Sequence, residues 1–247
     1  LLMTGIQHVV IDEADHMLDL GFIPDVNKIL RHVPPKHQTL FFSATLSPDI
    51  QKLSQEYLKS PKEIRISPAS STSHTIEQFC IQAKIKDKRS ILRTLIQEKS
   101  IQTAIIFCNR KSDVSLLTAS LKRHGFKAGM MHGDLLQTER IKTLEHFKAK
   151  DISFLVASDV AARGIDVDDL PFVINFDVPK NPEEYVHRIG RTGRAGKTGI
   201  AFTLVSDTEK KKLKAIENLI QKPLATYELT LKNTPSSSDV KKKSEKE

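Results

Sequence analysis

Long apolar runs and cysteine clusters are missing from this sequence of 247 residues. No apolar stretch is long enough to cross a bilayer, and the first residues lack the basic-then-apolar order of a signal peptide. These absences predict a soluble, cytoplasmic protein without a membrane partner. The two cysteines, Cys80 and Cys108, each lie in an apolar strand-like run, so we expect buried free thiols and no disulfide framework. The nine histidines show no zinc-like spacing with them, which argues against a structural metal.

Charge and composition favour a nucleic-acid partner. Lysine and arginine number 38 against 30 acidic residues, and the resulting formal charge of +8 favours a polyanion. Part of that excess lies in the lysine-rich end, 233–247. With 39% hydrophobic residues, the chain can bury one large core or two smaller ones.

After residue 75 the sequence alternates short apolar runs with longer amphipathic stretches. The expected strands cover 76–83, 103–108, 127–132, 153–158, 172–176 and 200–206. The expected helices cover 87–99, 112–125, 138–150, 182–189 and 207–222. In the third helix Ile141, Leu144 and Phe147 recur at helical spacing, which predicts a buried face. Apolar strands that alternate with such helices indicate a parallel sheet covered on both faces.

The part before residue 75 has fewer strands. Two of them, 9–13 and 39–45, precede a segment rich in Ser and Thr. A parallel sheet with so few strands is hard to close. We therefore expect this part to be the back half of an α/β domain, with apolar surface and strand edges left exposed. The predicted organisation is a partial domain at 1–66, a linker at 67–75, a complete domain at 76–230 and a disordered basic tail at 231–247.

Three carboxylates follow the first strand in the stretch VVIDEADHML. An acidic, solvated turn is the ordinary explanation, whereas ligands of open α/β sheets bind at the carboxyl ends of strands. Magnesium bound with a nucleotide needs one or two carboxylates plus waters, so Asp12 can hold the hydrated ion while Glu13 orients or deprotonates the attacking water. The next strand ends in hydroxyls, Ser43 and Thr45, at the same expected edge. Helix capping is their ordinary explanation, although Ser47 is the better cap candidate.

The segment YVHRIGRTGRAGKTG places Arg188, Arg191 and Arg194 at three-residue spacing, with Gly190 and Gly193 leaving room for a large ligand. A basic helix face without a ligand is the ordinary explanation. Such a face would avoid glycine, which costs about 1 kcal/mol per residue relative to alanine. Arginine forks aimed at phosphate explain both the charge and the glycines.

Four motifs in this order resemble the DEAD-box family of ATP-dependent RNA helicases: DEAD at 12–15, SAT at 43–45, ASDVAARGIDV at 157–167 and HRIGRTGR at 187–194. The resemblance covers the chain from residue 1 to about 225. It implies an α/β fold with RecA-like parallel sheets and flanking helices, in which a partial first domain is followed by a complete second domain. It also implies that ATP, Mg and RNA bind across the cleft between the two domains.

The resemblance gives roles to five residues of the first domain. Asp12 and Glu13 resemble the magnesium-binding and water-activating acids of the family. Asp15, Ser43 and Thr45 resemble the set that couples ATP turnover to domain closure.

In the second domain, Arg191 and Arg194 match the arginine fingers of the family. Such fingers offset charge on the transferred phosphoryl group and are worth ~10³–10⁵ in rate where measured. The rest of the implied ATP-binding group is the acid that binds the ribose, two residues of its loop, and the histidine that meets the first domain on closure: Asp166, Arg163, Gly164 and His187.

Three further residues look like contacts to the RNA backbone: Gln137, Arg140 and Ser158. The first two are spaced by three and share a helix face, for which a solvated surface is the ordinary explanation. Ser158 replaces a usual threonine and keeps the hydroxyl, and His16 follows DEAD where arginine is frequent in the family.

No G-x-x-x-x-G-K-[ST] phosphate-binding loop occurs in the sequence. Without that loop the β and γ phosphates lack a cradle, so we expect the chain by itself to be inactive unless the missing N-terminal half of domain 1 is supplied. The leading hypothesis is the C-terminal portion of an ATP-dependent RNA helicase that unwinds RNA or remodels RNA–protein complexes. Two alternatives stay open, namely a non-catalytic RNA-binding or partner-binding module and a DNA-directed motor.

Overall fold

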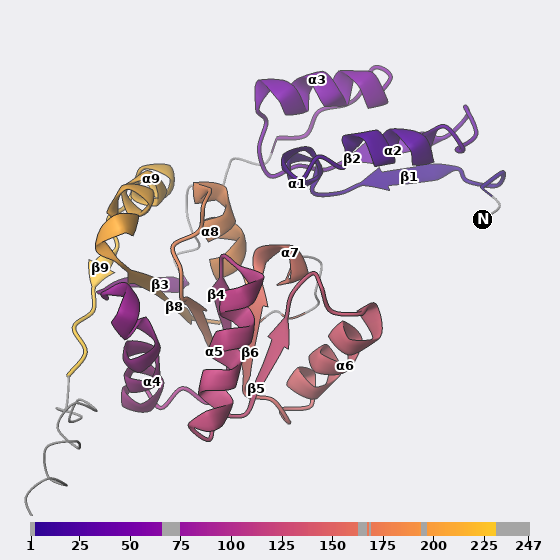
Figure 1. Ribbon diagram of the computed structural model, residues 1–247. Helices are drawn as coiled ribbons and strands as arrows, with labels where there is room; N and C mark the ends of the chain where they lie inside the picture. The colour runs from indigo at the N-terminus through magenta and orange to yellow at the C-terminus, as the bar shows by residue number, and fades with distance from the viewer. Residues whose placement is uncertain (1–2, 66–74, 163–166, 168, 194–196, 231–247) are drawn as a thin grey trace, which may run out of the picture. The chain divides into compact units, whose positions relative to one another are not determined.

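The computed structural model describes residues 3–65, 75–162, 167, 169–193 and 197–230 (Figure 1). The chain divides into two compact units, Leu1–Pro68 and Ala69–Glu247. Within the described ranges, no helix combines the length and apolar character that crossing a membrane requires.

The first unit is built on two parallel strands, β1 (His8–Ile11) and β2 (Gln38–Phe41). Its helices are α1 (Ala14–Asp19), α2 (Ile23–Leu30) and α3 (Pro48–Tyr57). The predicted cap of α3 is confirmed, because the Ser47 hydroxyl accepts the Ile50 amide at 3.3 Å and proline fills the first helical turn.

One face of this small sheet is covered and the other is open. Ile11 packs with Ala14 and Ile50 in the core of the unit. On the opposite face Val10 is paired with Leu40, and they are 59% and 39% exposed. Phe42, two residues further along, is 53% exposed. The predicted exposure of apolar surface is therefore confirmed for the described residues.

The second unit holds a seven-stranded sheet in the order β5-β6-β4-β7-β8-β3-β9, in which every pairing is parallel. Its strands are β3 (Ile76–Gln82), β4 (Ala104–Cys108), β5 (Ala128–Met131), β6 (Phe154–Ser158), β7 (Phe172–Asn175), β8 (Gly199–Val205) and β9 (Ala225–Thr226). Its α-helices are α4 (Lys88–Glu98), α5 (Lys111–Arg123), α6 (Gln137–Lys148), α7 (Asp159–Ala162), α8 (Pro182–Ile189) and α9 (Lys210–Ile220). Two 3₁₀ turns, η1 (Ile85–Asp87) and η2 (Asp207–Glu209), lead into α4 and α9.

Both faces of this sheet are covered, as the apolar strands predicted (Figure 1). Helices α4 and α5 pack on the face that carries Ile106 and Phe202. Helices α8 and α9 pack over Ala201 and Val205, while α6 and α7 pack over Ile105 and neighbouring side chains of the same strands. The mixed α/β class with parallel sheets is thus confirmed.

The predicted elements of the second unit all occur, with boundaries that agree to within a few residues. The short elements α1, α2, α7, η1 and β9 were not predicted. The predicted burial of Ile141 is wrong, because this residue is 47% exposed, whereas Phe147 is buried and Leu144 packs partly against the core. Both cysteines are buried free thiols, as predicted.

Candidate functional site

The DEAD carboxylates lie where the parallel pair predicted them, directly after the end of β1. Asp12 is exposed, and one of its oxygens accepts the amide of Glu13 at 2.9 Å. Glu13 precedes α1 with φ 51° and ψ 45°. This left-handed conformation is rare outside glycine and costs on the order of 1–3 kcal/mol, a strain that proteins keep mainly at functional positions.

Hydrogen bonds join the DEAD and SAT segments. One carboxylate oxygen of Asp15 accepts both the amide of Thr45 at 3.0 Å and its hydroxyl at 3.1 Å. The Ser43 hydroxyl donates to the carbonyl of Thr45 at 2.8 Å. The structure therefore brings together the three residues that the motifs grouped, since Asp15 and Ser43 both bond to Thr45.

The donor set after β1 fits a magnesium ion. Mg²⁺ takes one or two carboxylates and keeps several waters, so it needs an accessible acid at a strand end. Asp12 and Glu13 meet this need, since Asp12 is exposed and Glu13 follows it at the same edge. In the part of the chain that the structure describes, no cluster of three or more His, Cys, Asp or Glu side chains forms an all-protein metal cage.

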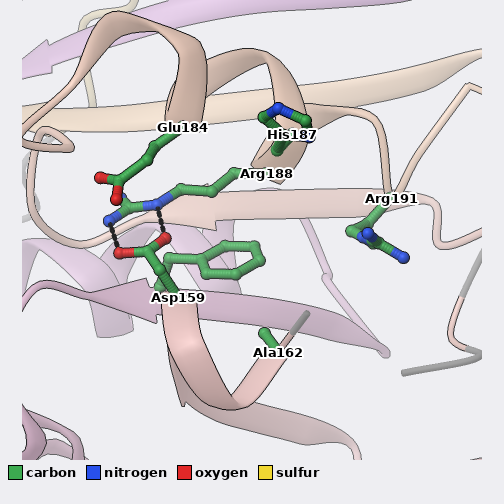
Figure 2. A pocket seen from close by; sticks show the side chains of 7 residues that line it. Asp159, Ala162, Glu184, His187, Arg188 and Arg191 are labelled. Atoms are coloured by element: carbon green, nitrogen blue, oxygen red, sulfur yellow. Dashed lines mark hydrogen bonds and ion pairs between the residues drawn. The ribbon is translucent and has the colours of Figure 1, made fainter. Parts of the chain in front are cut away.

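In the second unit, a shallow pocket opens at the carboxyl ends of β4 and β6 (Figure 2). His187 and Arg191, two of the predicted ATP-site residues, line it. The other lining residues are Phe107, Asp159, Ala162, Glu184 and Arg188. In Figure 2 Arg191 lies apart from the Arg188–Asp159 pair, on the side of the pocket where α8 has ended.

Arg188 corrects the interpretation of the three arginines as forks aimed at phosphate. Its side chain is 1% exposed and grips both oxygens of Asp159, with Nε at 2.5 Å and Nη2 at 2.7 Å (Figure 2). Its guanidinium also stacks over the ring of Phe107, 5.2 Å from the centroid. Five arginine donors in a fixed plane suit such a bidentate contact. Arg188 therefore binds the protein itself and orients α8.

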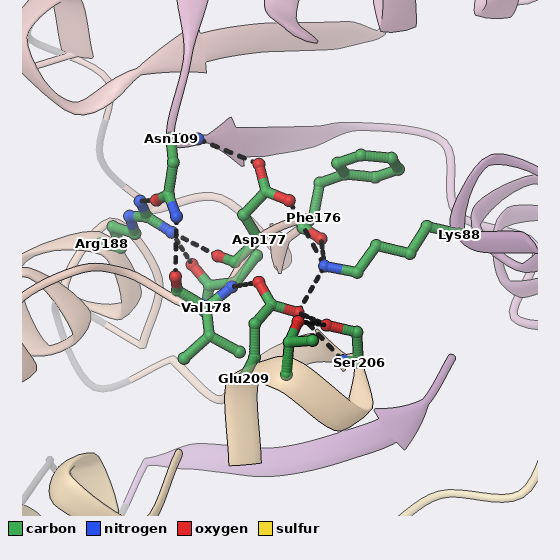
Figure 3. Close-up of polar contacts among 10 residues, drawn as sticks. Lys88, Asn109, Phe176, Asp177, Val178, Arg188, Ser206 and Glu209 are labelled. Atoms are coloured by element: carbon green, nitrogen blue, oxygen red, sulfur yellow. Dashed lines mark hydrogen bonds and ion pairs between the residues drawn. The ribbon is translucent and has the colours of Figure 1, made fainter. Parts of the chain in front are cut away.

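Around Arg188 runs a buried polar network (Figure 3). Its Nη1 donates to the carbonyl of Asp177 at 2.8 Å and its Nη2 to the side chain of Asn109 at 2.8 Å. The amide of Asn109 in turn donates to the carboxylate of Asp177 at 3.0 Å, and its side chain donates to Val178. The ends of β4 and β7 are thereby fixed to α8.

Lys88, the first residue of α4, extends the network to Glu209 in η2 (Figure 3). Its ammonium contacts the carboxylate of Asp177 at 3.3 Å and that of Glu209 at 2.8 Å, and it donates to the carbonyl of Phe176 at 2.9 Å. The Lys88 side chain is 4% exposed. A buried ammonium of this kind is tolerated only because it is paired and hydrogen-bonded.

The network shifts the pKa of Glu209. Burial raises the pKa of Glu209, but the bonds from Lys88 and from the hydroxyl and amide of Ser206 outweigh it. The pKa of Glu209 is consequently lowered from its ordinary value of 4.5.

Burial also raises the pKa of Cys108 well above its ordinary value, with the nearby charge of Asp177 adding to the effect. Cys108 is therefore a core residue and not a reactive thiol.

Gly193 corrects a second expectation, that it leaves room for a ligand. Its φ is +68°, and a Cβ at this position would lie 2.5 Å from Cγ1 of Ile76 and 3.0 Å from the hydroxyl of Thr75. The glycine is required because the start of β3 packs against it.

The predicted RNA contacts gather near α7. Gln137 and Arg140 share a face of α6, as predicted, since Nη1 of Arg140 donates to the side chain of Gln137 at 3.2 Å. The Nη2 of Arg140 donates to the carbonyl of Ala161 in α7 at 3.3 Å. Ser158 is the last residue of β6, directly before α7. The structure therefore places all three residues at or next to α7, at the carboxyl end of β6.

Four predicted site residues lie outside the described residues: Arg163, Gly164, Asp166 and Arg194.

Apart from Arg188, the residues that build the polar network had no role in the sequence-based prediction. Asp159, Asn109 and Asp177 each follow the end of an apolar strand, the same signal that singled out Asp12. For Lys88 there was no comparable signal, because one lysine at the start of an amphipathic helix predicts a solvated residue.

Comparisons with known proteins agree with the motifs. A family model described as "DEAD/DEAH box helicase" matches residues 2–53, and one described as "Helicase conserved C-terminal domain" matches residues 87–196. The chain is 43% identical over 222 residues to the DEAD-box ATP-dependent RNA helicase CshA of Bacillus licheniformis, an alignment that covers 90% of this chain and 46% of that protein. The chain thus spans about half the length of the curated relatives it matches.

Solved structures show the same similarity. The structure of the E. coli DEAD-box protein SrmB bound to regulator of ribonuclease activity A is 31% identical with a TM-score of 0.60, covering 63% of this chain and 92% of that chain. S. cerevisiae Dbp5 bound to RNA and ADP BeF3 is 29% identical with a TM-score of 0.83, covering 91% of this chain and 60% of that chain.

Proposed function

Because the chain belongs to the DEAD-box helicase family, we propose that it is the C-terminal portion of an ATP-dependent RNA helicase. In the intact protein, ATP binding and hydrolysis drive the unwinding of RNA duplexes or the remodelling of RNA–protein complexes. The observation that carries the proposal is the bond between the DEAD and SAT segments, in which Asp15 holds both the amide and the hydroxyl of Thr45.

The proposed organisation of the chain is the one expected from its sequence. Residues 1–66 belong to the first RecA-like domain, 67–75 link it to the second, 76–230 form the second, and 231–247 are a basic tail.

In the first unit, Asp12 and Glu13 would hold magnesium at the end of β1. When bound, the ion neutralises phosphate charge and acts as a Lewis acid on the phosphoryl oxygens. Glu13 orients the attacking water and accepts its proton. The left-handed backbone of Glu13 supports this role, because it turns the chain abruptly from β1 into α1 and fixes where the carboxylate projects.

In the second unit, Arg191 and Arg194 stabilise the charge that develops on the transferred phosphoryl group. His187, which lines the same pocket as Arg191, would meet the first domain when the enzyme closes. The burial of Arg188 supports this division of labour, since it anchors α8 and leaves His187 and Arg191 to line the pocket. The ribose and its loop contacts fall to Asp166, Arg163 and Gly164.

Asp15, Ser43 and Thr45 couple ATP turnover to domain closure. Any movement of the DEAD turn on nucleotide hydrolysis moves the Asp15 carboxylate, and with it the segment that ends at Thr45. The coupling is local, through three hydrogen bonds, so we expect it to be sensitive to loss of the Thr45 hydroxyl.

RNA is the proposed partner. Arg140, which bonds to Gln137, contacts α7, and Ser158 directly precedes this helix. All three would contact the phosphate backbone. Contacts of this kind position a strand without reading its sequence, so we expect little sequence preference and a strong dependence on salt. The similar Dbp5 structure is a complex with RNA and ADP BeF3, which supports the choice of partner.

A second candidate is an RNA-binding module that works without ATP. The observation that favours it is that the second unit has its own complete seven-stranded sheet, with the candidate RNA contacts all inside this unit. Salt-dependent RNA binding that ATP does not change would support this candidate over the enzyme.

The test is RNA-stimulated ATP hydrolysis by two proteins, the 247-residue chain and the protein extended upstream to include a phosphate-binding loop. We expect activity only in the extended protein, because the arginines and carboxylates alone do not cradle the β and γ phosphates. Glu13→Gln should lower kcat at least about 10²-fold, with little change in stability. Glu56→Gln, an exposed acid on α3, is the matched control and should leave kcat unchanged. Activity in the short chain would contradict the need for a phosphate cradle, and inactivity of both would favour the RNA-binding module.

A further inference from the structure

The first described residue of the second unit, Thr75, is bonded to the arginine segment more than a hundred positions away. Its hydroxyl donates to the carbonyl of Gly193 at 2.7 Å. Its own carbonyl accepts the amide of Gly199 at 2.8 Å. Thr75 therefore holds both ends of the chain between Gly193 and the start of β8, the segment that contains Arg194.

Side chains from the start of the second unit pack tightly against Gly193. The glycine is in the left-handed conformation, and the side chain of Ile76 occupies the space where a Cβ would be. Thr75 and Ile76 thus both contact Gly193, Thr75 through a hydrogen bond and Ile76 through apolar packing.

The other side of the arginine segment is held by Leu170. Its amide donates to the carbonyl of Arg191 at 3.2 Å, and its carbonyl accepts the hydroxyl of Thr192. Thr192 is buried, at 1% exposed. The backbone from Arg191 to Gly193 is consequently fixed on two sides, by Leu170 and by Thr75.

We propose that Thr75 is a positioning residue for Arg191, acting through the carbonyl of Gly193. Resting on the proposed function, this inference gives the hydroxyl of Thr75 a part in placing that arginine finger. Gly193 lies two residues after Arg191, so a shift of its backbone moves the backbone of Arg191. Misplacing a reacting group by about 1 Å can cost on the order of 10²-fold in rate, so a single hydroxyl here can affect catalysis.

The position of Thr75 gives the contact a second consequence. It is the residue at which the proposed linker, 67–75, enters the second unit. The hydrogen bond from its hydroxyl therefore joins the first described residue of the second unit to the backbone that follows Arg191.

The experiment uses the protein extended upstream to a phosphate-binding loop and compares Thr75→Val with Thr75→Ser. Valine keeps the shape and loses the hydroxyl, whereas serine keeps the hydroxyl. We expect Thr75→Val to lower kcat for RNA-stimulated ATP hydrolysis about tenfold, with KM for ATP changed less than about threefold. Thr75→Ser should retain most of the wild-type kcat. An unchanged kcat in Thr75→Val, or an equal loss in both variants, would overturn the inference.

Two further measurements separate positioning from a general loss of stability. In an Arg191→Ala background, Thr75→Val should cause little additional loss of kcat, because the residue through which it acts has gone. Hydrogen exchange at the amide of Leu170 should be faster in Thr75→Val than in Thr75→Ser, since this amide donates to Arg191. Additive losses, or unchanged exchange, would mean that Thr75 acts elsewhere.

The outcomes for the two proposals can be told apart. An extended wild-type protein without ATP hydrolysis overturns the proposed function and this inference with it. An active wild type in which Thr75→Val retains full kcat overturns this inference alone.

Discussion

Strand β4 in the second unit and strand β1 in the first are both short apolar runs that lead into polar residues with a proposed role. All five residues of β4, AIIFC, are buried, whereas in β1, HVVI, only Ile11 is. The cause is the number of neighbours. Strand β4 has β6 and β7 on its two sides and helices on both faces, while β1 has β2 alone and helices on one face among the described residues.

The comparison shows that a strand sequence specifies burial only together with its partners. The proposed site residues of the two units also differ in the size of the core on which they rest. The carboxylates Asp12 and Glu13 rest on a small core centred on Ile11, Ala14 and Ile50. The arginine pocket rests on a complete sheet and on the buried network around Arg188 and Lys88.

The largest expected effect comes from breaking that network at Arg188. Replacing Arg188 by Ala should lower the free energy of unfolding of the second unit by about 3–5 kcal/mol, because it leaves Asp159 partly buried and unpaired. Denaturant unfolding followed by circular dichroism measures this, and Lys180→Ala, an exposed cation ahead of the same helix, is the control. Replacing Arg188 and Asp159 together by Met and Leu should recover much of the loss. Equal stability of Arg188→Ala and the wild type would show that the network does not support the unit.

A smaller effect is expected on the pH dependence of stability. The pKa of Glu209 in the folded protein lies below its ordinary value of 4.5. Its contribution is therefore complete above about that pH and is lost as the pH falls through the folded-state pKa. Glu209→Gln should reduce stability at neutral pH and flatten its decline in acid, as unfolding curves between about pH 7 and pH 3 would reveal. The exposed residue Glu77, changed to Gln, serves as the control, and an unchanged acid slope in Glu209→Gln would contradict the role of the Lys88 pair.

The smallest effect on stability, but a clear one on association, is expected at the open face of the first unit. Val10→Thr with Phe42→Gln should change the free energy of unfolding by no more than about 0.5 kcal/mol, since both side chains are largely exposed. The pair should reduce self-association of the chain, measured by light scattering against concentration, because an exposed apolar face favours it. Leu116→Gln, at an equally exposed position in α5, should have a smaller effect. If it reduced association as much, the contrast between the units would not hold.

Much of this protein could be predicted from local pattern. Apolar runs of the right length, separated by amphipathic stretches, predicted the strands and main helices of the second unit, because each pattern repeats with the period of its element. The short helices α1 and α7 escaped, since four to six residues are too few for a period to show. Strand β9 has two residues and exists only because β3 offers an edge.

The candidate site divides in the same way. Asp12, Glu13 and Thr45 were singled out by their places after strands, and Arg191 by its spacing beside glycines. The roles of Asp15 and His187 were expected from the resemblance to the family. The tertiary structure decided which charges face inward. Arg188 and Arg191 are three residues apart and chemically identical, yet Arg188 is bound by Asp159, Asn109 and the carbonyl of Asp177 from three different segments. Likewise, only folding brings Thr75 to Gly193. Contacts between residues so distant in the chain depend on where the whole sheet places its edges. A local sequence pattern cannot predict them.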